Sequence, residues 1–223
     1  LHIQTLDNAQ CCLLDAYICS DWFDSYDYEH DNEQLFGINT IALQKVMDVL
    51  DATQTLEIVL DPNQDNINIS MKGSQTTCDK RFEVPLVDLE IDLMTPDDSE
   101  YDADIVMRSK QFTTLVKQLQ GFSDTMATCL TNDTISLKSS GEGGSMVANV
   151  NIETDVVEYA ITEDTEIKQS FGLKYIEYMY SFGGLSAEVN IHMNDNQPMQ
   201  VRYNFSENDD NSYVAFYLAP KMD

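Results

Sequence analysis

The sequence predicts an α+β fold made of two similar domains, and three observations carry this prediction. Short apolar segments bounded by turn residues recur along the chain, while three other segments place apolar residues at helical spacing, which is typical of a sheet-rich fold with few helices. A six-residue pattern returns 135 residues later, each time before a helix and a hairpin. An acidic stretch, residues 86–101, separates the two halves.

The first half is predicted to consist of strands around one short helix. Leu1–Ile18 is expected to form two strands with a turn at Asp7 and Asn8, and Trp22–Asn32 a strand followed by a loop. In Thr40–Leu50, five apolar residues fall at helical spacing, which predicts an amphipathic helix. The strands expected after it, around a turn at residues 61–66, are Leu56–Leu60, Ile67–Met71 and Lys80–Val84.

The second half is predicted to hold two helices. Ser109–Leu119 is the first, because Ser109 is a typical N-cap residue and apolar residues share one helical face. Phe171–Phe182 is the second. The run SSGEGG, Ser139–Gly144, resembles a phosphate loop only in its glycines, and since no helix follows it we expect a hairpin turn. The expected strands are Ala103–Met107, Ala127–Leu130, Thr134–Lys138, Ser145–Asn151, Asp155–Ala160 and the hairpin Ala187–Phe205.

An internal repeat relates the two halves. Phe36–Ile41 and Phe171–Ile176 share the pattern F-G-[IL]-x-x-I, and each opens a predicted helix that leads to a predicted hairpin. The second half places 67 residues, Asp104–Ser170, before its Phe-Gly pair, whereas the first half places 35. We therefore expect the first domain to lack about 30 residues at its front.

The distribution of charge favours some partners over others. The chain has 12 Lys and Arg residues against 39 Asp and Glu, a net charge of −27, so most of its surface should repel nucleic acid and anionic membranes. The three predicted helices nevertheless hold four basic and only two acidic residues. Chance in a small sample is one explanation. The other is a helix face that contacts a polyanion through its phosphates, without sequence preference.

No motif predicts a metal site, a cofactor or a catalytic centre. The five cysteines, at positions 11, 12, 19, 78 and 129, fit no zinc or redox spacing and are predicted to be free thiols in a reducing compartment. No apolar run is long enough to span a membrane, and no signal peptide is visible. Adjacent carboxylates such as Asp97–Asp98 and Asp209–Asp210 are expected by chance in so acidic a chain, and the three histidines belong to no motif, so an enzyme is disfavoured.

The C-terminal run Phe216-Tyr217-Leu218-Ala219-Pro220-Lys221-Met222 closely resembles the Y-Y-L-A-P-K-[IM] ending of the proliferating cell nuclear antigen family, the eukaryotic DNA sliding clamps. Other similar stretches follow in family order along the chain. They are Leu35–Asn39, Pro62–Gln64, Leu86–Glu90 and Leu173–Tyr175.

The resemblance implies a DNA-clamp fold in which three chains, each of two similar α+β domains, form a ring. Helices would line a central channel that holds duplex DNA, and sheets would form the outside. The implied division is an N-terminal clamp domain at 1–85, incomplete at its front, an interdomain connector at 86–101 and a C-terminal clamp domain at 102–223. An alternative is a subunit of the related checkpoint clamp, a heterotrimer. The intact Leu218–Lys221 run favours the replication clamp, because checkpoint subunits keep it poorly.

The resemblance also implies partners and a location. It implies a nuclear, non-enzymatic scaffold without cofactors that forms a homotrimer. DNA polymerase, clamp loader, nuclease and ligase would dock on it through peptides of the form Q-x-x-[ILM]-x-x-aromatic-aromatic. The loop lysine that accepts ubiquitin in many relatives aligns with Thr131, so we expect that switch to be absent.

Residue roles follow from the same resemblance. The implied DNA-channel residues are Lys45, Lys110, Lys117 and Lys174. The implied partner-peptide groove residues are Leu6, Leu13, Leu93, Met94, Pro198, Tyr217, Leu218, Ala219 and Pro220. The implied subunit interface joins the edge strands Lys80–Val84 and Met146–Val150 through Phe82, Met146, Val147 and Val150. Asp48, Thr114 and Ser181 stand where the family often has Lys or Arg, so weak DNA affinity is expected.

Overall fold

The computed structural model describes residues 1–28, 34–61, 63–73, 78–88, 93–96, 100–206 and 209–221, with only the backbone at positions 209 and 210. The chain divides into two compact units. The smaller is Asp27–Thr95, and the larger combines Leu1–Tyr26 with Pro96–Asp223. No helix in the described ranges is both long enough and apolar enough to cross a membrane.

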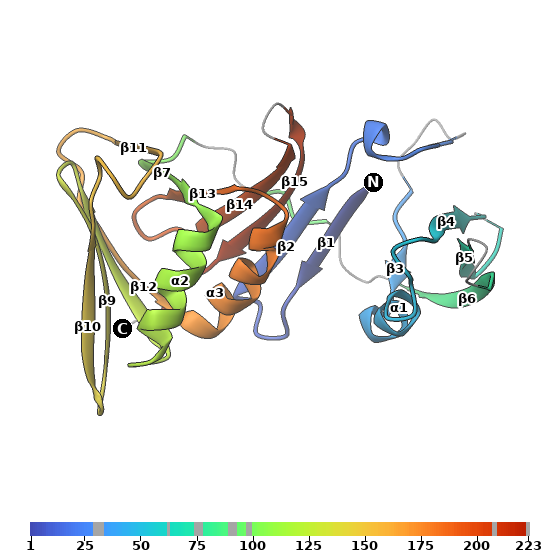
Figure 1. Ribbon diagram of the computed structural model, residues 1–223, viewed down its shortest axis with the longest axis horizontal. Helices are drawn as coiled ribbons and strands as arrows, with labels where there is room; N and C mark the ends of the chain where they lie inside the picture. The colour runs from blue at the N-terminus through green and yellow to red at the C-terminus, as the bar shows by residue number, and fades with distance from the viewer. Residues whose placement is uncertain are drawn as a thin grey trace. The chain divides into compact units, whose positions relative to one another are not determined.

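The smaller unit is one antiparallel sheet with a helix against it (Figure 1). The helix, α1 (Thr40–Met47), begins where predicted because the side chain of Asn39 accepts hydrogen bonds from the backbone N–H groups of Ile41 and Ala42. The strands, in sheet order, are β3 (Gly37–Ile38), β6 (Lys80–Val87), β5 (Asn66–Lys72) and β4 (Thr55–Leu60). The buried core is Val46, Ile67, Ile69, Met71 and Val84.

The larger unit contains two sheets. The strands of the seven-stranded sheet, in order, are β1 (His2–Leu6), β2 (Cys12–Tyr17), β15 (Asp209–Leu218), β14 (Met199–Ser206), β13 (Glu188–Met193), β7 (Ala103–Arg108) and β11 (Glu158–Ile161). Those of the four-stranded sheet are β10 (Gly144–Val150), β9 (Thr134–Gly141), β8 (Thr125–Thr131) and β12 (Ile167–Gly172). Every pairing is antiparallel, so each strand can turn one face to the core and the other outward.

Two helices of the larger unit, α2 (Ser109–Gln120) and α3 (Leu173–Tyr180), lie side by side against the sheets (Figure 1). A short 3₁₀ helix, η2 (Ser181–Gly184), follows α3. Both helices bury apolar residues at helical spacing, which leaves their opposite faces exposed. The buried helical side chains are Phe112, Val116, Leu119, Leu173, Ile176 and Met179.

The internal repeat is confirmed as a repeat of structure. In both halves the Phe-Gly pair leads from a strand into a helix, and three antiparallel strands follow: β3-α1-β4-β5-β6 matches β12-α3-β13-β14-β15. A further copy, β7-α2-β8-β9-β10, has the same order but no Phe-Gly pair. The repeated order of strand, helix and three strands therefore depends on the pattern of burial and turns. The Phe-Gly pair marks only two of the three copies described.

The predicted hairpin at SSGEGG is also confirmed. Gly141 pairs with Gly144 across a two-residue loop. Gly144 has a φ of +134°, which L residues rarely adopt. A Cβ at Gly141 would lie 2.2 Å from the backbone oxygen of Phe122. The glycines of this run thus serve a tight turn and a close backbone approach, and no helix N-terminus follows them.

Three local predictions were wrong. Ser109 does not cap α2, because β7 runs directly into the helix and Arg108 takes the N-cap position, while the buried Ser109 hydroxyl has no partner among the described residues. Trp22 ends a 3₁₀ helix, η1 (Ser20–Trp22), and residues 23–28 form no strand; positions 29–33 lie outside the described residues. The α3 helix begins only after Gly172, because the Phe-Gly pair completes β12.

The compact units differ from the predicted domains at both ends of the first domain. Leu1–Tyr26, expected in the first domain, belong to the larger unit, because β2 pairs with β15 over six residues and Ala16 joins the core of that unit. Leu86 and Val87, expected in the connector, continue β6 and pair with Ile38 and Gly37 of β3. In both cases the hydrogen-bonded pairing of strands, β2 with β15 and β6 with β3, determines which unit the residues join.

Candidate functional site

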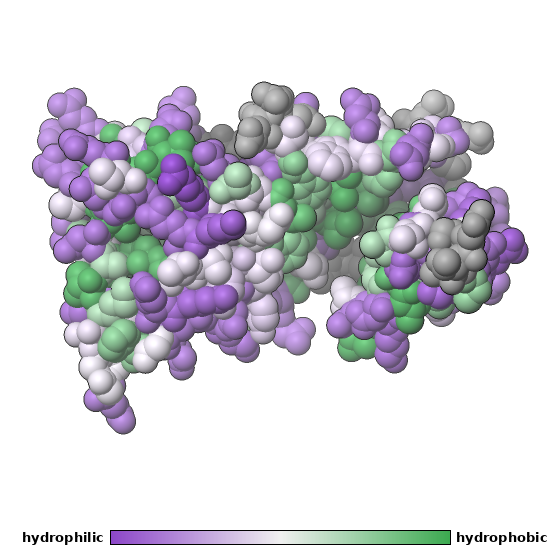
Figure 2. All heavy atoms as spheres, in the orientation of Figure 1, coloured by the Kyte–Doolittle hydropathy of each residue, from purple (hydrophilic) through white to green (hydrophobic). Residues whose placement is uncertain are grey.

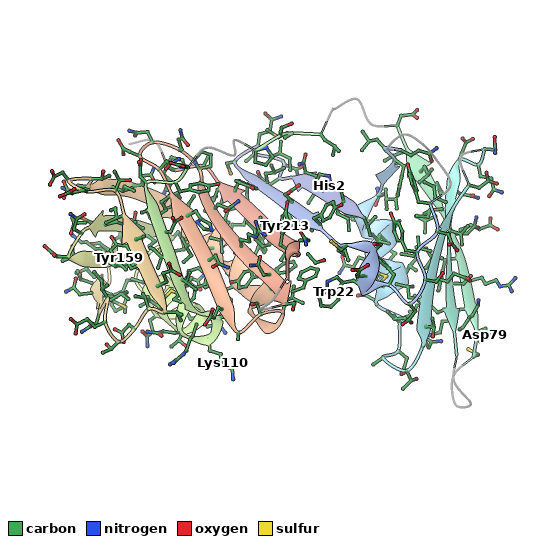
Figure 3. The ribbon with its side chains drawn as sticks, turned by 90° about the horizontal axis from the view of Figure 1, so that it is seen from above. His2, Trp22, Asp79, Lys110, Tyr159 and Tyr213 are labelled. Atoms are coloured by element: carbon green, nitrogen blue, oxygen red, sulfur yellow. The ribbon has the colours of Figure 1, made fainter. Side chains whose placement is uncertain are left out.

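The exposed face of α2 and α3 carries three of the four predicted channel lysines. Lys110 and Lys117 are seven residues apart on α2, which places them on one helical face about 10 Å apart along the axis. Lys174 is exposed on the first turn of α3. Figure 2 shows hydrophilic residues over α2, and Figure 3 shows Lys110 pointing outward from that helix. Lys45, the fourth, is exposed on α1 of the smaller unit.

These lysines are available for an external anion. Of the carboxylates that the structure describes, none forms an ion pair with Lys45, Lys110, Lys117 or Lys174. By contrast, Lys72 and Lys168 on strands pair with Glu57 and Glu166, at 3.1 and 2.7 Å. The helix-face lysines are thus among the basic residues whose charge no described carboxylate neutralises through an ion pair.

The non-basic residues on the helices make local bonds instead. The hydroxyl of Thr114 donates to the backbone oxygen of Lys110 at 2.8 Å, and that of Ser181 to the oxygen of Tyr178 at 2.5 Å. Asp48 is the C-cap of α1. A hydroxyl bonded to its own helix is a weaker phosphate ligand than a free ammonium group.

A row of side chains crosses the outer face of the seven-stranded sheet, the face away from the core. Leu6 pairs with Leu13, Leu13 with Tyr217, and Tyr217 with Gln200, so the four side chains share one face over β1, β2, β15 and β14. The Gln200 amide donates to the Tyr217 hydroxyl at 2.7 Å, which fixes the ring. The structure therefore brings Tyr217, which is distant in sequence, beside Leu6 and Leu13 of the predicted partner groove.

The remaining groove residues of the larger unit are placed less uniformly. Leu218 lies on the opposite face, 1% exposed in the core, so only its backbone could meet a peptide. Ala219 donates its N–H to the oxygen of Cys11 at 2.9 Å, and Pro220 follows it half-buried. Pro198 is exposed in the β13–β14 turn.

The C-terminal residues are anchored beyond the last strand. The backbone N–H of Lys221 donates to the oxygen of Ser170, and its ammonium group to the hydroxyl of Thr125, both at 2.7 Å. These bonds hold the Leu-Ala-Pro-Lys run against β12 and β8. Its conformation is therefore determined by the larger unit.

Leu93 and Met94 belong to the smaller unit by its contacts and are 42% and 48% exposed. The rest of the acidic stretch is described only in part, since residues 89–92 and 97–99 lie outside the described ranges. At its far end the ring of Tyr101 stacks on that of His192 at 5.0 Å, on the outer face of the seven-stranded sheet. The end of the stretch is thus fixed to the larger unit.

Sequence reasoning missed the bonds that hold the β1–β2 turn. The Asp7 carboxylate accepts backbone N–H bonds from Ala9, Cys11 and Cys12, and the Tyr175 hydroxyl of α3 donates to it at 3.2 Å. Burial opposes the charged form, but these donors hold the pKa of Asp7 below its ordinary value. The turn at Asp7 was predicted, whereas its partner lies 168 residues away.

Both strands assigned to the subunit interface have a stretch that, among the described strands, is paired on one side only. Among the described strands β10 pairs only with β9, and the Lys80–Pro85 part of β6 pairs only with β5. Val147 on β10 is 54% exposed, whereas Met146 and Val150 turn toward the core. Phe82 is half-buried and lines an open groove of about 610 Å³ between β6 and α1, which Lys45 also lines. An unpaired edge beside such a groove is a typical place for another strand.

Among the described residues, the chemistry-bearing side chains form no recognisable catalytic centre. In the described ranges no three His, Cys, Asp or Glu side chains gather as metal ligands would. His2 and His192 each contact one carboxylate, Asp15 and Asp104, at 2.5 Å. Thr131 contacts Thr134 in a β-hairpin. The paired carboxylates at 97–98, the side chains at 209–210 and the third histidine lie outside the described residues.

Comparison with known proteins accounts for the whole chain. Residues 1–95 match the family model "Proliferating cell nuclear antigen, N-terminal domain", and residues 95–221 match "Proliferating cell nuclear antigen, C-terminal domain". The chain is 26% identical over 235 residues to "Proliferating cell nuclear antigen 1" of Plasmodium falciparum, isolates K1 / Thailand and 3D7, covering 100% of this chain and 85% of the relative. It is 25% identical over 232 residues to "Proliferating cell nuclear antigen 2" of isolate 3D7, covering 100% and 86%.

Proposed function

Because the chain belongs to the proliferating cell nuclear antigen family, we propose that it is a DNA sliding clamp, a polymerase processivity factor that encircles duplex DNA as a homotrimer and recruits replication and repair proteins in the nucleus. The observation that carries this proposal is the match of both family domains together with a helix face whose lysines form no ion pair with any described carboxylate. A clamp performs no chemistry, so we expect no turnover.

Ring closure is supported by the two edges. Among the described strands, β10 and the Lys80–Pro85 part of β6 are each paired on one side only, and a head-to-tail joint between copies would pair the other side of both. A closed ring of three would leave neither edge exposed.

A ring that encircles DNA would allow this acidic protein to hold a nucleic acid despite its negative charge. Each subunit has a net charge of −27, so free DNA should be repelled at a distance. Inside a ring, Lys110, Lys117 and Lys174 would lie closest to the phosphates, and charges beyond about 8 Å are screened at physiological salt. Binding should thus be topological, weak at equilibrium and indifferent to sequence.

Partner recruitment is supported by the row Leu6, Leu13 and Tyr217 and by the anchored C-terminal run. This row would bind the two aromatic rings of a Q-x-x-[ILM]-x-x-aromatic-aromatic peptide, and Leu93 and Met94, as the family resemblance implies, would also contact that peptide. Such peptides on polymerase, clamp loader, nuclease and ligase would compete for one groove.

The deciding experiment compares how long the protein is retained on circular DNA and on linear DNA with free ends. The protein is loaded by a clamp loader onto nicked circular DNA and onto linear DNA with free ends, and retention is measured after gel filtration. Retention on circles alone supports the clamp. Equal loss from both, or binding to one preferred sequence, would refute it.

The second candidate is a subunit of a checkpoint-type heterotrimer. The intact run Leu218–Lys221 and its bonds to Ser170 and Thr125 favour the homotrimer, since a recruiting groove depends on that run. Sedimentation of the purified chain separates the two, because a heterotrimer subunit alone would remain monomeric.

A further inference from the structure

The surface between α2 and α3 holds an acid where a DNA-facing helix pair should have none. Glu177 is exposed on α3, on the side that faces α2, where Lys117 is also exposed. A lysine beside a glutamate ordinarily forms an ion pair, and that pair would compete with a phosphate for the ammonium group. Within this surface, which the structure describes completely, Lys117 and Glu177 form no ion pair.

We propose that Tyr180 and Gln120 are positioning residues that keep Glu177 away from Lys117 and so reserve Lys117 for a DNA phosphate. The inference rests on the proposed function, because it assigns a role within the DNA-facing surface. The proposal adds two neutral residues, Gln120 and Tyr180, to the lysines that were assigned to the DNA-facing surface by their charge.

Gln120 engages the acid from the α2 side. Its amide nitrogen donates to a carboxylate oxygen of Glu177 at 3.2 Å, and also lies 3.4 Å from the backbone oxygen of Leu173. A neutral donor satisfies the carboxylate without cancelling a positive charge on the same surface. Gln120 thereby restrains Glu177 beside its own helix.

Tyr180 engages the base from the α3 side. Its ring lies under the ammonium group of Lys117, 5.2 Å from the centroid, an arrangement in which a cation is attracted yet keeps its donors free. Tyr180 therefore holds the base while Gln120 holds the acid.

The framework under this network is rigid. Leu119 beside Gln120, and Ile176 and Met179 beside Glu177 and Tyr180, have no exposed surface. Side chains on packed helices hold their geometry better than side chains on loops. The separation of Lys117 from Glu177 is thus a stable property of the α2–α3 pair.

The test is the salt dependence of binding to a fluorescently labelled linear duplex at low ionic strength, measured by anisotropy on the trimer. Gln120→Leu removes the amide that holds Glu177, and Tyr180→Leu removes the ring that holds Lys117, so in each variant the two charges can pair. For each we expect weaker binding and a slope of log K against log salt that falls by about 0.9, the loss of one phosphate contact. Glu177→Gln should bind at least as tightly as the wild type. Gln120→Leu or Tyr180→Leu added to Glu177→Gln should change nothing further, because the competing acid is gone.

A purely structural role for Gln120 and Tyr180 would weaken binding equally in both backgrounds, and that result would overturn the inference, as would Gln120→Leu and Tyr180→Leu proteins that bind like the wild type. Lys110→Gln and Lys117→Gln separate this failure from that of the proposed function. If they lower the slope while Gln120→Leu and Tyr180→Leu do not, only the positioning role is wrong. If no variant changes the slope, the helix face does not contact DNA and the proposed function fails with it.

Discussion

The hydroxyl of Tyr175 in α3 donates a hydrogen bond to the carboxylate of Asp7 in the β1–β2 turn, 3.2 Å away. The bond fastens the first hairpin to the helix layer of the larger unit at the point where Ala219 bonds Cys11. Two parts of the chain that are 168 residues apart are therefore joined by one half-buried polar contact.

Loss of that contact should loosen the hairpin. Tyr175→Phe removes the hydroxyl and leaves the ring, so we expect the free energy of unfolding to fall by about 1 kcal/mol in urea denaturation. Tyr178→Phe, on the exposed side of the same helix, is the matched control and should have no effect. A Tyr175→Phe protein as stable as the wild type would contradict the role given to the bond.

The Asp7 carboxylate should make the free energy of unfolding depend on pH. The pKa of Asp7 in the folded state lies below its ordinary value of 3.8, so its contribution is complete above that value and is lost as pH falls through the folded pKa. We expect the stability gap between wild type and Asp7→Asn to be widest near neutral pH and to shrink below about pH 4. Asp133→Asn, in an exposed turn, provides the comparison, and a gap that grows in acid would reverse the sign of the argument.

The proposed trimer can be tested through one edge strand. Phe82→Ala should remove packing beside the β6 edge and shift sedimentation from trimer toward monomer at micromolar concentration. Val59→Ala, an exposed site on β4 of the same unit, should leave the trimer intact. A Phe82→Ala protein that stays trimeric with unchanged stability would place the subunit joint elsewhere.

The helix face should set the salt dependence of DNA binding. Each of Lys110→Gln and Lys174→Gln is expected to lower the slope of log K against log salt by about 0.9. Lys168→Gln makes the same charge change on a strand, at a lysine already paired with Glu166, and should leave the slope unchanged. Equal effects from all three variants would show that net charge, not the helix face, controls binding.

The partner groove should lose affinity when its exposed apolar residues are truncated. We expect micromolar binding of a Q-x-x-L-x-x-F-F peptide by calorimetry, and at least a tenfold loss, about 1.4 kcal/mol, for Leu93→Ala combined with Met94→Ala. Val157→Ala, a similarly exposed residue of the larger unit, is the control. Equal affinity for the wild type and the double variant, with the fold intact by circular dichroism, would remove the groove from this position.

Local features of the sequence determined the elements. The helical spacing in Thr40–Leu50 and Ser109–Leu119 predicted α1 and α2 to within three residues, and turn residues predicted the hairpins. The exposed faces of Lys110, Lys117 and Lys174 also follow, because spacing along one helix fixes which residues share a face. These properties depend on neighbours in the sequence, so a pattern is enough to reveal them.

Tertiary structure alone decided which elements meet. Strand periodicity could not show that β2 pairs with β15, since an edge offers its backbone to any partner and the choice depends on the area buried. That choice turned Tyr217 outward beside Leu13 and Leu218 into the core, although both had been assigned to the groove. The bonds of Tyr175 to Asp7 and of Gln120 to Glu177 span 168 and 57 residues. Contacts of this kind arise only when packed layers bring distant residues within hydrogen-bond range, and no local pattern encodes them.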